Sequence, residues 1–159
     1  MRKLTIAVTG ALALLALPAM AQQAGPPAYG PSITQEQARA AGQAAIAEAK
    51  KNNWRMAITI VNTAGDLVYF ERVDDTQGAS LLISQKKART AALYKRTTKV
   101  LAENLAKGAT FYLTFPDLIA SEGGIPIMVD GKIVGAIGAS GGTGEQDGMV
   151  SAAGIAAIK

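Results

Sequence analysis

EGGIPIMVDGKIVGAIGASGGTGEQD, residues 122–147, is the stretch that decides the fold. Two short apolar runs flank Asp130-Gly131. An Asp-Gly pair between such runs is the strongest short-range sign of a β-hairpin, because both central residues of a type I′ turn need positive φ. The second run carries Gly135 and Gly138, which weaken a strand and indicate that another backbone or a ligand packs closely on that face. The stretch therefore predicts a hairpin with a closely covered second strand.

The hairpin opens into a glycine-rich turn, GGTG at residues 141–144, followed by a helix expected over residues 145–158. Free N–H groups and the positive end of a helix dipole at such a turn favour an anionic group. The alternative is a tight strand-to-helix connection. A dinucleotide fingerprint does not fit, because Asp147 stands where its last glycine would be, and no lysine follows to make a Walker loop. Asp147 is either a ligand contact or a residue that favours the helix dipole.

The other elements are predicted from periodicity and end signals. A helix should begin after Thr34, with Gln37 as its capping-box partner, and end at Asn52-Asn53. The remaining expected elements are strands over 56–61 and 67–72, helices over 80–95 and 98–107, a loop over 111–115 and a short strand near 118–120.

This order contains hairpins and no alternating β-α units, which indicates an α+β fold with helices packed on an antiparallel sheet. Residues 56–61 are apolar on both faces of their strand. Helices mainly on one side would leave the other face of the sheet uncovered. We therefore expect a homo-oligomer.

The N-terminus has the parts of a secretory signal peptide: basic Arg2 and Lys3, an apolar run over 6–17 and an A-x-A site at 19–21. The apolar run is too short to span a membrane comfortably. We predict a signal peptide over 1–21, a flexible leader over 22–33 and one domain over 34–159. The protein is then periplasmic or secreted, without stable membrane insertion after cleavage.

Composition excludes several classes of chemistry. The chain has no cysteine and no histidine, so disulfides, thiol chemistry, the commonest general base and the usual haem ligand are all absent. Ser140 has no histidine to activate it, and zinc hydrolysis lacks its usual ligands. The net charge of +4 falls by two if Arg2 and Lys3 are removed, so it argues little for nucleic acid.

Several motifs together resemble one known family. They are YFERVDD at 69–75, KARTA at 87–91, GGIPI at 123–127, DGKIVGAIGASGG at 130–142 and QDGMVSAAGIAAI at 146–158. They are similar to the GlcG/HbpS family of haem-binding or haem-degrading domains, which also form the C-terminal half of PduO-type cobalamin adenosyltransferases. The resemblance covers about residues 34–158. It implies a five-stranded, profilin-like or PAS-like antiparallel sheet, larger assemblies and haem as the first candidate ligand.

The candidate ligand-binding residues combine this resemblance with the charge pattern. Lys87 and Thr90 share a helical face, match the family's K-A-x-T-A motif and lie in a basic run that could attract haem propionates. A solvated helix face is the alternative. The resemblance places Arg72 and Asp74 beside the pocket, where Arg72 could clamp a carboxylate; otherwise both are simply exposed at a strand end. The set is completed by Gly124, Ser140, Gly141, Gly142 and Asp147.

Bound haem would need an iron ligand other than His or Cys. The available candidates are Tyr112, Tyr94 and Met128, whose alternative roles are core packing or an interface. Asp74 and Asp75 could contact a hard cation, but two adjacent carboxylates are weak evidence. The sequence therefore does not identify a site for a metal other than haem iron.

The leading hypothesis is an exported, oligomeric protein that binds a tetrapyrrole or small anionic ligand, with haem first. An enzyme that degrades haem or acts on a small carboxylate would instead need an acid or lysine of perturbed pKa in its pocket. A sensory or structural partner of a membrane receptor would need a large exposed apolar patch.

Export has a direct test. N-terminal sequencing of protein recovered from the periplasm should begin at Gln22, free or as pyroglutamate, because the A-x-A site precedes it. An intact Met1 on protein in the membrane fraction would contradict the predicted cleavage.

Overall fold

The computed structural model describes residues 25–158, so the predicted signal peptide lies outside the described residues. Between those limits the chain has an α+β fold, as the sequence predicts. Its elements are α1 (Gln35–Lys51), β1 (Ala57–Asn62), β2 (Leu67–Arg72), α2 (Gly78–Tyr94), α3 (Thr98–Ala106), the 3-10 helix η1 (Thr110–Thr114), β3 (Gly124–Val129), β4 (Lys132–Ser140) and α4 (Gly144–Ala156).

The strands of residues 25–158 form one antiparallel sheet of four, in the order β2-β1-β4-β3. The Asp-Gly hairpin is confirmed, because Asp130 and Gly131 join β3 to β4 with φ of 48° and 72°. The expected fifth strand near 118–120 is wrong. Those residues lie in a loop whose Ile119 N–H donates to the Thr90 hydroxyl on α2, 3.1 Å away, rather than to a neighbouring strand.

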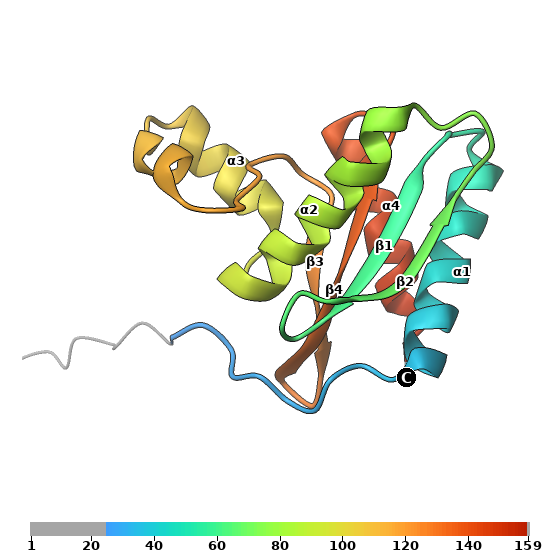
Figure 1. Ribbon diagram of the computed structural model, residues 1–159, viewed down its shortest axis with the longest axis horizontal. Coiled ribbons are helices and arrows are strands. Elements are labelled where there is room, and N and C mark those ends of the chain that lie inside the picture. The colour runs from blue at the N-terminus through green and yellow to red at the C-terminus, as the bar shows by residue number, and fades with distance from the viewer. Residues whose placement is uncertain (1–24, 159) are drawn as a thin grey trace, which may run out of the picture.

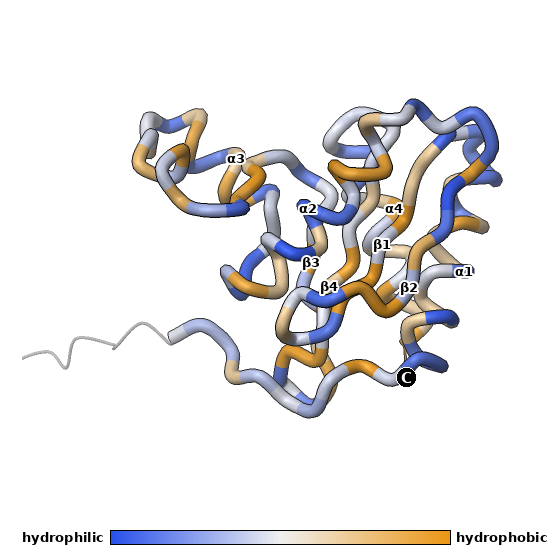
Figure 2. Tube along the Cα trace, in the orientation of Figure 1, coloured by the Kyte–Doolittle hydropathy of each residue, from blue (hydrophilic) through white to orange (hydrophobic). Residues whose placement is uncertain are grey.

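Helices of this chain cover both faces of the sheet (Figure 1). α1 and α4 pack together on one face, and α2 crosses β1, β4 and β3 on the other. In β1, Ile58 and Ile60 point into the core under α1 and α4, whereas Thr59 and Val61 face α2. Figure 2 shows the hydrophobic residues gathered along the central strands. The argument that an uncovered sheet face requires an oligomer is therefore wrong, because α2 supplies the cover.

Small residues allow these layers to approach closely. α1 begins at the predicted capping box, in which Thr34 and Gln37 exchange both bonds. It then turns four fully buried alanines toward the sheet and α4: Ala38, Ala41, Ala45 and Ala49. The close approach expected at Gly138 is confirmed, since a Cβ there would lie 2.3 Å from the Ser84 carbonyl oxygen of α2.

α3 and η1 project away from the sheet, and we call them the arm (Figure 1). The loop expected over 111–115 is wrong for residues 111–114, which belong to η1, whereas Phe115 follows that helix in an extended conformation. Their rings pack locally: the centroids of Phe111 and Tyr112 are 4.4 Å apart, and Phe115 stacks on Tyr94 at 5.9 Å. Phe111 and Leu113 nevertheless stay 55% and 71% exposed. The arm therefore presents apolar surface to solvent.

The described part of the predicted leader lies against the sheet. Gly30 N–H donates to the Ile133 carbonyl at 2.8 Å, and Ile33 N–H donates to that of Val134 at 2.7 Å. These residues occupy the stretch of β4 that β1 leaves unpaired. Among the helices of residues 25–158, none has the length and apolar character needed to cross a bilayer.

Candidate functional site

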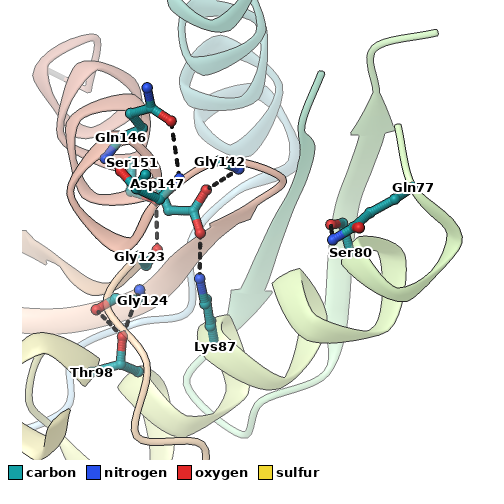
Figure 3. Close-up of polar contacts among 11 residues, drawn as sticks. Gln77, Ser80, Lys87, Thr98, Gly123, Gly124, Gly142, Gln146, Asp147 and Ser151 are labelled. Atoms are coloured by element: carbon teal, nitrogen blue, oxygen red, sulfur yellow. Dashed lines mark hydrogen bonds and ion pairs between the residues drawn. The ribbon is translucent and has the colours of Figure 1, made fainter. Parts of the chain in front are cut away.

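The buried charges of the predicted site pair with each other. Lys87 Nζ on α2 lies 2.6 Å from Asp147 Oδ2 on α4, and the two side chains are 2% and 4% exposed (Figure 3). The two helices lie on opposite faces of the sheet. The ion pair therefore joins the two layers.

Two glycines at the start of β3 make room for this pair. A Cβ on Gly123 would lie 3.0 Å from Lys87 Nζ and 2.8 Å from Asp147 Cβ. The φ of Gly123 is +124°, a conformation that side chains rarely allow. A Cβ on Gly124 would lie 2.4 Å from the Lys87 carbonyl oxygen. The EGGIP motif thus leaves a gap through which Lys87 reaches α4.

The glycine-rich turn already holds an anionic group from its own chain. Gly142 N–H donates to Asp147 Oδ1 at 3.0 Å, and Thr143 N–H donates to the Gln146 side chain at 2.9 Å. Thr143 and Gln146 form a second capping box at the start of α4. The Asp147 carboxylate therefore occupies the position that the sequence suggested for a ligand anion.

Burial raises the pKa of the Asp147 carboxyl above its ordinary value, and the Lys87 ammonium and the N–H groups of the turn oppose that rise. Two buried opposite charges with this geometry neutralise each other in an ion pair. They can fix the two layers, but they do not leave a charge open to solvent.

Hydroxyl groups around the pair fix the neighbouring backbone (Figure 3). Thr98 Oγ1 accepts from Gly124 N–H at 2.8 Å, and Ser151 Oγ donates to the Gly123 carbonyl at 2.7 Å. Sequence reasoning missed both residues, because a hydroxyl within a helix carries no motif that predicts such a contact.

Thr90 lies inside the molecule. It is fully buried, and its hydroxyl donates to the Asp117 carbonyl at 3.2 Å and accepts from Ile119 N–H. It therefore fixes the loop between η1 and β3. Its predicted contact with a ligand stays a proposal.

The structure does not bring Arg72 and Asp74 to the buried pair. Strand register places Arg72 beside Ala57, and Ala57 beside Ser140, at one end of the sheet. Ser140 is buried, whereas Arg72 and Asp74 are exposed. Among the described residues, no hydrogen bond or ion pair joins either exposed residue to Lys87 or Asp147.

The three candidate iron ligands belong to two regions. Tyr94 hydroxyl donates to the Pro116 carbonyl at 2.7 Å, and Tyr112, 8% exposed, accepts from the Asn104 amide at 3.4 Å. Both rings belong to the aromatic cluster at the arm. Met128 is 40% exposed on the edge strand β3. Residues 25–158 contain no cluster of three or more acidic, histidine or cysteine side chains suited to a metal ion.

Residues 33–156 match the family described as "Haem degrading protein HbpS-like". The chain belongs to the HbpS-like family. It is 44% identical over 108 residues to Protein GlcG of Escherichia coli K12, covering 68% of this chain and 81% of that protein. It is 31% identical over 120 residues to the corrinoid adenosyltransferase PduO of Salmonella typhimurium, covering 73% of this chain but 36% of that protein.

Solved structures of this family share the fold. HbpS of Streptomyces reticuli, solved as a double mutant, has a TM-score of 0.76 and 28% identity, covering 91% of this chain and 99% of that one. PduOC, solved as a haem complex, has a TM-score of 0.75 and 27% identity, covering 80% and 96%. The sequence motifs that resemble this family, KARTA, GGIPI and QDGMVSAAGIAAI, carry Lys87, the two glycines of the gap and Asp147.

The glycine gap has a matched mutational test. Gly124→Ala should destabilise the protein by roughly 1–3 kcal/mol, because its Cβ would meet the Lys87 carbonyl, which cannot move without α2. Gly78→Ala is the control, since nothing lies within 4 Å of a Cβ there. Urea unfolding of both variants checks this. Equal midpoints for the two would contradict the close approach.

Proposed function

We propose that this chain is an exported, self-associating protein that binds haem or a related anionic tetrapyrrole. The observation that carries the proposal is membership of the HbpS-like family together with similarity to PduOC, a protein solved as a haem complex. A similarity of fold does not by itself establish a ligand, so the side chains available for haem matter.

The side chains available here suit the macrocycle of haem better than its iron. The sequence has neither His nor Cys. Tyr94 and Tyr112 already use their hydroxyls in hydrogen bonds. Of the three candidate iron ligands in the described chain, Met128 is therefore the one whose side chain makes no hydrogen bond. Apolar rings, in contrast, are exposed on the arm and can stack on a flat porphyrin. Burial of the macrocycle and contacts to its propionates should therefore dominate the affinity.

The two basic residues first suggested for the propionates now have different roles in the proposal. Arg72 is exposed on β2, at the edge of the sheet opposite the arm, so it would hold a propionate of a haem stacked on the arm only where two copies meet. Lys87 is committed to Asp147, so we assign it a supporting role beneath the surface. The same reasoning assigns Asp147 and the glycine turn to the framework.

Self-association rests on the arm. Leu113 is an exposed apolar residue on a projecting element, where burial against a second copy would remove apolar surface from water. A membrane receptor that binds the same surface is the alternative partner.

Haem degradation is the second candidate function, favoured by the description of the family. It needs an accessible reactive group, and the pair with the deepest burial, Lys87 and Asp147, is closed to solvent. Mass spectrometry of haem incubated with the protein, a reductant and oxygen distinguishes intact haem from an opened tetrapyrrole.

Haem binding can be separated from iron ligation. Titration with haemin and with metal-free protoporphyrin should give saturable binding of comparable affinity, because the macrocycle supplies most of the contacts. Arg72→Ala should weaken both by about tenfold if it holds a propionate. Tyr112→Phe should change the haem spectrum only if that phenol ligates iron.

The control for this titration is Lys132→Ala, an exposed cation at the start of β4, away from both the arm and Arg72. A saturable response to haemin with none to protoporphyrin would show that iron ligation dominates. The absence of a saturable response to either compound would rule out the proposed function.

The assembly should appear in light scattering. Wild-type protein at micromolar concentration should show a multiple of the monomer mass, and Leu113→Glu should shift it toward the monomer by placing a charge in the buried surface. Leu67→Glu is the control, because Leu67 is 57% exposed on β2, at the edge of the sheet opposite the arm. A monomeric wild type would contradict self-association and favour the receptor as partner.

A further inference from the structure

A cavity of about 420 Å³ lies between the β1–β2 hairpin and α2, away from the buried Lys87–Asp147 pair. α2 packs on β1, β4 and β3, so this side of β2 is left open (Figure 1). The volume falls within the range of small-molecule sites. Val61, Leu67 and Leu82 supply its apolar lining.

Four charged residues line the same cavity. Lys86 and Arg89 are neighbours on one face of α2, Asp66 comes from the β1–β2 turn, and Asp117 comes from the loop before β3. No ion pair among the described residues joins either cation to either carboxylate. The two positive and two negative groups therefore stand around the cavity without neutralising one another directly.

Hydrogen bonds hold two of these residues in place. Arg89 Nη1 donates to the Gly65 carbonyl at 3.1 Å, which orients the guanidinium while leaving its other N–H groups for a ligand. Asp117 has a φ of +55°, which is uncommon outside glycine, and the buried Thr90 hydroxyl binds its carbonyl. Thr90 is thus a positioning residue for Asp117.

We propose that this cavity binds a small zwitterion of the amino-acid type. Its carboxylate pairs with Lys86 and Arg89, its ammonium group with Asp66 and Asp117, and its apolar side group lies against the leucines at the cavity wall. A simple anion would bring its charge close to two carboxylates, whereas a zwitterion gives each of the four charges an opposite partner. Neither Lys87 nor Asp147 lines this cavity.

Three compounds of matched shape test the charge requirement. Leucine carries both charges, isocaproate lacks the ammonium group, and isoamylamine lacks the carboxylate. Calorimetric titration of the full chain should show saturable binding of leucine and binding at least about tenfold weaker for the other two. Equal binding of isocaproate, or no saturable binding of leucine, would overturn the proposal.

Variants test the location. Lys86→Gln and Asp117→Asn should each weaken leucine binding by about tenfold, because each removes one charged partner. Lys107→Gln, which changes an exposed cation on the arm, should leave it unchanged. Unfolding midpoints measured on the same samples confirm that the variants are folded. Wild-type affinity in both cavity variants would overturn the assignment of the cavity.

Discussion

The buried contact between Lys87 and Asp147 is the one on which the rest of this structure depends. Removing two charges from water costs several kcal/mol for each ion, and close geometry with further hydrogen bonds must offset that cost. Here the contact is 2.6 Å, and the second oxygen of the carboxylate accepts a backbone N–H of the glycine turn. The pair connects α2 to α4 around the start of β3. It therefore fixes where both layers meet the sheet.

Several of the motifs that resemble the HbpS-like family contribute to this contact. Gly123 and Gly124 leave the gap, the turn at 141–144 delivers Gly142 N–H, and the first turn of α4 carries Asp147. The residues of these motifs build the packing between the helices and the sheet. The proposed ligand chemistry lies on surfaces that this framework positions: the arm with its exposed rings, and the charged cavity beside α2.

The sequence predicted the parts of the fold that depend on local chemistry. Asp130-Gly131 predicted its hairpin, Thr34 and Gln37 their capping box, and Gly138 the close approach of a helix. The fifth strand was wrong because Thr90, nearly thirty residues away, takes the N–H of Ile119. The arrangement of helices on both faces is likewise a long-range property that periodicity does not report.

In the candidate site, too, the sequence indicated individual residues but not their long-range contacts. Sequence reasoning selected both Lys87 and Asp147, but as separate contacts to a ligand. They lie 60 residues apart, and only the folded sheet shows that they bind each other. The cavity lined by Asp66 and Asp117 was missed, because its residues come from a turn, a helix and a loop with no shared motif.

A double-mutant cycle on Lys87→Met and Asp147→Leu tests the central role of the buried pair most directly. Each single variant leaves one charge buried without its partner, so each should lose about 3–5 kcal/mol of unfolding free energy. The double variant removes both charges and should lose less than either single variant. Losses that simply add, or single variants as stable as the wild type, would contradict the account.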